Sequence, residues 1–432
     1  MQKHHPVVLL VVGLIITLVI LIARHVPSPT SSKAPTATST VAHASSSDLI
    51  QMLEAAVEAS TSTDITLELR LAALYLQQVR DTADASFYGR VDTLMDRAQK
   101  KQPQNDLIEA VRAQTDLGRH EFIRALEHGK KALGLEPTRA AYYGLIGDAY
   151  VELGQDDKAI DSFQQMVDLH PDLGSYSRIA YVRELHGDID GAIEAFEQAI
   201  EAGATIPENL AWTHIQLGDL WLRRDADKAA QYYSDAEELA KKPYAPAEKG
   251  LGRVAYRKGD LDQAEKHLLK AFDILPTAEH AIDIADLYLA KDEPDKATPY
   301  LTLADLAFKK SANSGVKTEL ESAVFLADHG LDPERALVQA RTAHHDRPSI
   351  FGADALGWAL AQANRAQEAE PYIKEALRLG EHDPTILYHT GMVRMKQGKT
   401  EEGKRLLHLA IEKHHSFSPL AVKQIQEILA SK

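Results

Sequence analysis

The chain has 432 residues, of which 44% are hydrophobic and 26% are charged, a balance typical of soluble globular and repeat proteins. Its formal net charge of −15 argues against nucleic acid as a main ligand, because binding to phosphates requires a basic surface. The sequence contains no cysteine, which excludes disulfides, thiolate zinc sites and cysteine nucleophiles.

The chain begins with an apolar segment. Residues 6–23 (PVVLLVVGLIITLVILIA) carry no charged side chain over 18 positions. At about 1.5 Å per residue, a helix of this length just crosses a hydrocarbon core of about 30 Å. The alternative is a cleaved signal peptide, whose apolar region is typically about 7–15 residues long and is followed closely by a small-x-small site. The nearest such site is residues 42–44. We therefore predict an uncleaved, single-pass transmembrane anchor over residues 1–24.

The next segment, residues 25–47, is rich in Ser, Thr, Ala and Pro. This composition cannot bury a core and predicts a disordered linker. Lys3 precedes the apolar segment, and Arg24 and Lys33 follow it, so the positive-inside rule gives almost no bias in orientation. Because tethers of this kind are common outside the cytoplasmic membrane, we expect a bacterial membrane protein whose main body is extracytoplasmic.

In the rest of the chain, residues of the same type recur at a fixed spacing, although the sequence itself is not repeated. Between residues 106 and 415, amphipathic runs of about 12–15 residues are separated by Gly-Asp, Asp-Asp or Pro turns. One small residue recurs at the same place in each run: Ala125, Ala159, Ala192, Ala229, Ala264, Ala297, Ala336, Ala369 and Gly403. The steps average about 35 residues, a period that indicates a solenoid of stacked units.

The small residues have a physical role within each unit. Gly147 and Ala159 would let two antiparallel helices approach closely, and Gly154 would supply the left-handed residue that ends the first of them. Asp156 begins the second helix, where the helix dipole favours a negative charge. Pro171 cannot continue that helix and therefore closes the unit.

These residues resemble a known signature. The apolar, small and proline positions of residues 143–171 resemble the tetratricopeptide repeat: Tyr143, Ile146, Gly147, Tyr150, Ala159, Phe163, Met166 and Pro171. The resemblance implies an all-α, right-handed superhelical solenoid of helix–turn–helix units. We expect nine units over 106–415, preceded by a degenerate helical repeat region at 48–105 and followed by a capping helix at 416–432. The unit near 317–348 follows an extended linker, expected at 309–319.

The resemblance also implies a function. Tetratricopeptide repeats resemble binding scaffolds in which the first helices of successive units line a concave groove for protein or peptide partners. Carried over unit by unit, the groove positions of this sequence are Tyr181, Trp212, Ile215, Lys249, Arg253, Tyr256, Arg257, Phe325, Trp358, Tyr388 and Met392.

Three of these positions are basic. Lys249, Arg253 and Arg257 follow one another at four-residue spacing, so that they share one helix face. Such a row can receive a carboxylate or an acidic peptide through charge-assisted hydrogen bonds. The alternative is that each cation pairs with acidic residues of neighbouring units.

Motifs for catalysis or metal binding fail on inspection. The helix that begins His120-Glu121 resembles a zinc-protease helix, but Arg124 occupies the place of its second His. The Asp188-Ile189-Asp190-Gly191 run lacks the later ligands of a calcium loop. We therefore expect no enzymatic activity, no cofactor and no metal.

The sequence as a whole predicts a membrane-tethered scaffold that binds protein or peptide partners in its concave groove. Two alternatives remain open. One is a structural protein that self-associates, and the other is a repeat subunit of an envelope machine for secretion, pilus assembly or polysaccharide export. No residue identifies the partner or the oligomeric state.

Overall fold

The computed structural model describes residues 46–204, 206–413 and 417–431. The predicted anchor and all but the last two residues of the predicted linker lie outside these ranges. Within them, no helix is both long enough and apolar enough to cross a bilayer.

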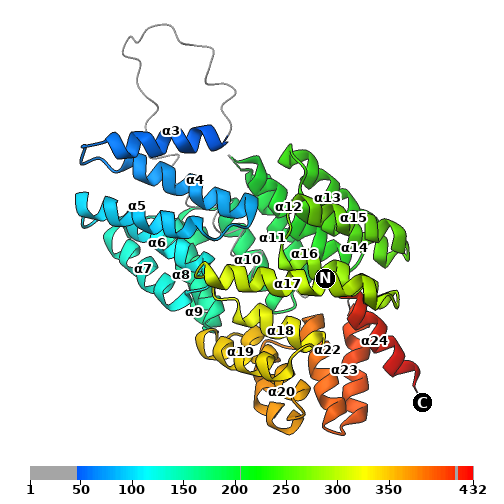
Figure 1. Cartoon of the computed structure of the whole chain (residues 1–432). Coiled ribbons are helices and arrows are strands. Elements are labelled where there is room, and N and C mark those ends of the chain that lie inside the picture. Colours follow the sequence, from blue (N-terminus) through cyan, green and yellow to red (C-terminus); the bar gives the residue numbers. More distant parts are fainter. Residues whose placement is uncertain (1–45, 205, 414–416, 432) are drawn as a thin grey trace.

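The described residues fold entirely into helices and their connections (Figure 1). Their bounds are α3 Ser46–Ala59, α4 Thr66–Thr82, α5 Phe87–Lys101, α6 Asp106–Gly118, α7 Phe122–Leu135, α8 Ala140–Glu152, α9 Asp156–Leu169, α10 Leu173–Leu185, α11 Ile189–Ala202, α12 Pro207–Leu222, α13 Ala226–Ala240, α14 Ala245–Arg257, α15 Leu261–Ile274, α16 Ala278–Ala290, α17 Pro294–Asn313, α18 Glu319–Asp328, α19 Pro333–Asp346, α20 Ile350–Gln362, the 3₁₀ turn η2 Ala366–Ala369, α21 Glu370–Ala376, α22 Pro384–Lys396, α23 Thr400–Lys413 and α24 Pro419–Ala430.

The recurring small residues lie where the two helices of a unit touch. The alanines of the series from Ala125 to Ala369 are all buried. At Gly147, an added Cβ would lie 2.3 Å from the ring of Phe163, so α8 and α9 can pack at their observed distance only because this residue has no side chain. Gly154 ends the turn between them with a φ of +66°, as its position after the first helix predicts.

The expected linker at 309–319 is partly helical. Helix α17 continues to Asn313, and the chain reverses only at Gly315, where φ is +84°. Lys309 and Lys310 favour helix, and the Asn-Ser-Gly run that follows supplies the stop. The extension matters because it places Lys310 and Ser311 on the same helix as Phe308.

The stack of units turns back on itself. The backbone N–H of Lys317 donates to the carbonyl oxygen of Arg119 at 3.0 Å, and a buried ion pair joins Arg347 to Glu152 across 195 residues of sequence. The same Gly154 that ends a turn also lies against this junction, because an added Cβ would be 2.1 Å from the carbonyl oxygen of Pro348. The solenoid is therefore a closed coil rather than an open arc.

Both ends of the described chain also pack against its middle. In α4, the Gln77 amide donates to Glu208 at 3.0 Å, so the first helices contact α12. At the other end, Ser418 begins α24 and donates to Asp286 of α16 at 2.6 Å. Figure 1 shows α24 beside α23, with its first residues directed toward α16. These contacts enclose the centre of the coil.

Candidate partner-binding cavity

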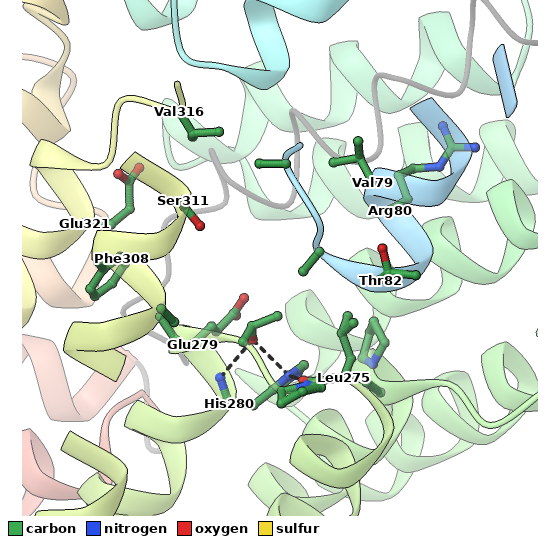
Figure 2. A pocket seen from close by; sticks show the side chains of 18 of the residues that line it. Val79, Arg80, Thr82, Leu275, Glu279, His280, Phe308, Ser311, Val316 and Glu321 are labelled. Carbon is green, nitrogen blue, oxygen red and sulfur yellow. Dashed lines mark hydrogen bonds between the residues drawn. The ribbon is translucent and has the colours of Figure 1, made fainter. Parts of the chain in front are cut away.

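A cavity of about 450 Å³ lies at the centre of the coil. Its wall is built from the end of α4, the first helices α12, α14, α16 and α18, and the extended end of α17. Figure 2 shows Val79, Arg80 and Thr82 of α4 on one side, with Glu279 of α16 and Phe308 and Ser311 of α17 on the other. Its size falls in the range of roughly 300–1,000 Å³ that is usual for ligand pockets.

Three of the groove positions predicted from the repeat line this cavity: Trp212, Lys249 and Phe325. Trp212 is only 6% exposed, and its indole N–H has no acceptor among the described residues. A buried donor without a partner is costly, typically by about 1–3 kcal/mol, and a bound ligand that supplies an acceptor would remove that cost. Phe325 adds an apolar wall, together with Phe308 and Val316.

The other predicted positions lie outside the cavity. Tyr181, Ile215, Trp358 and Tyr388 are buried in helix packing. The indole N–H of Trp358 donates to Asp328 at 3.0 Å, and the Tyr388 hydroxyl donates to the side chain of Gln424 in α24.

Two further groove positions are half-buried. The hydroxyl of Tyr256 lies 3.5 Å from the carbonyl oxygen of Pro419, at the start of α24. Met392 packs with the apolar residues around α22. The groove that an open solenoid would present here is therefore covered by the chain itself.

The basic row has acceptors within the chain. Lys249 pairs with Glu279 of the next unit, and Arg253 pairs with Asp219 of the preceding unit at 2.6 Å. Arg257 donates to the backbone carbonyl of Leu222. For Lys249 and Arg253, this is the pairing with acidic residues of neighbouring units that the alternative interpretation expects. Arg257 differs, because its acceptor is a backbone oxygen and not a carboxylate. Binding of an acidic peptide by the row itself stays a prediction.

Burial sets the charge of several groups around the cavity. It lowers the pKa of His120 and of His280, so both rings are neutral near pH 7. His280 lies within 2.7 Å of the carbonyl oxygen of Leu275. Burial acts to raise the pKa of Glu321, but Arg347 and His120 outweigh it and lower that pKa to about 2.

No sequence motif indicates the α4 side of the wall. Arg80 and Thr82 precede the regular repeats and belong to no motif, and only the coiling of the stack brings them opposite α16 and α17. The described part of the chain has no group of three or more His, Cys, Asp or Glu side chains placed to hold a metal ion.

Comparison with protein families identifies the repeat. Residues 145–172, 180–246 and 355–414 match family models described as tetratricopeptide repeat. These parts of the chain are therefore tetratricopeptide repeats. Repeats of this family build protein-interaction scaffolds, and no enzyme family is indicated.

The similar proteins cover the chain unevenly. The small glutamine-rich tetratricopeptide repeat-containing protein 2 of Mycosarcoma maydis is 30% identical over 82 residues, which are 19% of this chain and 23% of that protein. The Vi polysaccharide export protein VexE of Salmonella typhi is 36% identical over 95 residues, which are 21% of this chain and 14% of that protein. The chain thus spans less than a quarter of the length of these curated relatives.

Some solved structures are similar to this chain at low identity. Yeast Tom70 covers 89% of this chain and 91% of its own, with 16% identity and a TM-score of 0.39. The match to pilF of Pseudomonas aeruginosa covers 49% of this chain and 92% of that protein's chain, with 19% identity and a TM-score of 0.36.

Proposed function

We propose that this protein is a membrane-tethered scaffold whose central cavity binds a segment of a partner protein. The observation that carries the proposal is the composition of the cavity wall. Groove positions from three units, Trp212, Lys249 and Phe325, converge there with side chains from α4 and α17. A binding surface made by several units at once is the usual product of a repeat scaffold.

The cavity has the character of a binding site for a short segment. Apolar surface comes from Val79, Phe308, Val316 and Phe325. The buried indole N–H of Trp212 is a hydrogen-bond donor that has no acceptor among the described residues. A peptide offers both apolar side chains and backbone carbonyl oxygens. Because the helices that form the wall are held by contacts across the coil, the site is largely pre-formed, which lowers the entropic cost of binding.

Two sequence features support the proposed tether. Residues 6–23 are apolar over the length that a membrane span requires, and residues 25–47 have the composition of a flexible connector. Tethering would hold partner and scaffold on one surface and so raise their effective concentration.

A photo-cross-linking experiment in cells tests both parts. We expect p-benzoylphenylalanine in place of Phe308, which lines the cavity, to capture a defined segment of a partner protein in the membrane fraction. The same residue in place of Leu306, which lies on α17 but is 55% exposed and does not line the cavity, is the matched control.

The outcome is decided by the position that captures the segment. The proposal fails if Leu306 yields the same product as Phe308, because the partner would then contact the outer surface. The proposed membrane tether fails if the cross-linked product is recovered in the soluble fraction.

A further inference from the structure

Helix α24 covers part of the groove that the repeat pattern predicts. A helix that only capped the last unit would contact α22 and α23. Helix α24 packs its apolar face against both of them, through Phe417, Ala421, Val422 and Ile425. It also contacts α14 and α16. Its first turn therefore joins the end of the coil to a helix that lies 132 residues earlier in the sequence.

The start of α24 is anchored by a chain of buried hydrogen bonds. The Ser418 hydroxyl accepts the backbone N–H of Ala421, as the N-cap of α24, and it donates to Asp286 of α16 at 2.6 Å. The other carboxylate oxygen of Asp286 lies 2.9 Å from Nε2 of His329 in α18. All three polar side chains are buried. A helix that docks here thus places a hydroxyl donor at its N-cap against a buried carboxylate.

Three of the groove positions predicted from the repeat contact α24. The Tyr256 hydroxyl lies 3.5 Å from the carbonyl oxygen of Pro419, and the Tyr388 hydroxyl donates to the side chain of Gln424. Met392 packs against the apolar cluster that α24 forms with α22 and α23. Helix α24 therefore occupies a surface on which the resemblance to the repeat family places a partner.

The attachment of α24 differs from that of the repeat helices. Helix α22 pairs with α23, and α16 pairs with α17, so α24 packs on helices that already have partners. It has 12 residues, a length at which an isolated helix is only marginally stable in water. Its ion pair between Lys423 and Asp292 lies at an exposed rim and adds little. Docking thus depends on one apolar face and on the Ser418 anchor.

We propose that α24 is an internal ligand of a helix-binding surface on α14, α16 and α22, and that a partner helix of the same chemistry displaces it. Such a helix has a serine or threonine at its N-cap and apolar residues three, four and seven positions later, as α24 has. Tyr256, Asp286 and Tyr388 do not line the central cavity. The inference therefore goes beyond the proposed function and does not depend on it.

Cysteine labelling of the full chain measures whether α24 leaves the surface by itself. The chain has no cysteine, so one introduced thiol reports on one position. We expect Val422→Cys, in the buried face of α24, to react with a maleimide at least tenfold faster than Leu407→Cys, which is buried in α23. Ala430→Cys, exposed on α24, gives the rate of an unprotected thiol.

A fluorescent peptide of residues 417–431 tests whether the surface receives a helix. Val422→Asp in the full chain places a charge in the apolar face and should undock α24. The peptide should then bind at least tenfold more tightly than to the wild type, whose own α24 occupies the surface. Gln426→Asp is the matched control, because Gln426 is exposed on the same helix and its variant should bind as weakly as the wild type.

A second peptide, with alanine in place of its serine, tests the anchor. It should bind the Val422→Asp variant about tenfold more weakly, because Asp286 loses its hydroxyl donor. Equal binding of the two peptides would contradict recognition of the N-cap hydroxyl by Asp286.

Two further results would overturn the inference. Equal labelling rates at Val422 and Leu407 would show that α24 opens only together with the last unit. Equal binding of the serine peptide to the Val422→Asp and Gln426→Asp variants, both folded by circular dichroism, would show that no helix-binding surface lies beneath α24. If Val422→Asp unfolds the chain, the labelling rates decide. Capture of a segment at Phe308 has no part in these measurements, so the inference and the proposed function can fail separately.

Discussion

Replacing Arg347 with methionine is expected to lower the free energy of unfolding by about 3–5 kcal/mol. The Arg347 guanidinium is buried where the coil closes. It donates to Glu152 at 2.7 and 3.1 Å and to Glu321 at 2.9 Å, and it lies over the ring of Phe122 at 4.9 Å. Methionine would fill much of the space but would leave two buried carboxylates without their cation.

Urea unfolding of the purified full chain, followed by circular dichroism, measures this loss. Arg341→Met is the matched control, since Arg341 lies exposed on α19 and should change stability by less than about 0.5 kcal/mol. Adding Glu152→Gln and Glu321→Gln to Arg347→Met should restore part of the stability, because the neutral amides no longer need a counter-ion. Equal midpoints for the Arg347 and Arg341 variants would show that the closure is not held by this ion pair.

The second large effect is a pH dependence centred on His389. This ring is fully buried, stacks on Trp358 at 5.0 Å, and lies between Asp354 at 2.7 Å and Asp328 at 2.9 Å. Burial acts to lower the pKa of His389, but the two carboxylates outweigh it and raise that pKa from 6.5 to about 9. Both ring nitrogens can then donate, one to each carboxylate.

The raised pKa fixes the direction of the effect. A group with a higher pKa in the folded state contributes stability fully below its unfolded pKa, and the contribution is lost as pH rises through the folded pKa. We therefore expect the chain to lose on the order of 2–3 kcal/mol of stability between pH 6.5 and pH 9 through this group.

Urea unfolding of the wild type and of His389→Gln at pH 6.5 and pH 9 checks this. Glutamine cannot take up a proton, so its variant should be less stable at pH 6.5, and its stability should change much less between the two pH values. If the stability of the wild type changes as little between pH 6.5 and pH 9 as that of the variant, His389 is not charged in the folded protein.

The repeating unit could be read from the sequence because its determinants are local. Ala159, Gly147 and Gly154 act within one helical hairpin, so their spacing predicts both the close packing and the left-handed turn that the structure shows. The helix extension at Lys309–Asn313 was missed for an equally local reason: the turn signal Asn-Ser-Gly marks where the helix ends rather than where a linker begins.

The closure of the coil could not be predicted in this way. It depends on small rotations between successive units that accumulate over 195 residues, from Glu152 to Arg347. Nothing in the sequence indicates that Gly154 must also fit against the carbonyl of Pro348. The same closure explains why Trp358 and Tyr388, which the repeat pattern places in a groove, are covered by other parts of the chain.

The cavity was accordingly predicted in part. Trp212, Lys249 and Phe325 are groove positions that the resemblance to the tetratricopeptide repeat implies, and all three line the cavity. Arg80 and Lys310 could not be predicted, because one precedes the regular units and the other lies near the C-terminal end of an unusually long second helix.

Hydrogen–deuterium exchange of the full chain, alone and with the segment captured at Phe308, tests the central claim most directly. We predict that the segment slows exchange at 79–85, 274–282 and 307–318, which line the cavity from three directions, and leaves α7 and α19 unchanged. Slowing confined to α7 or α19, with no change at the three cavity segments, would place the partner on another surface and contradict the account.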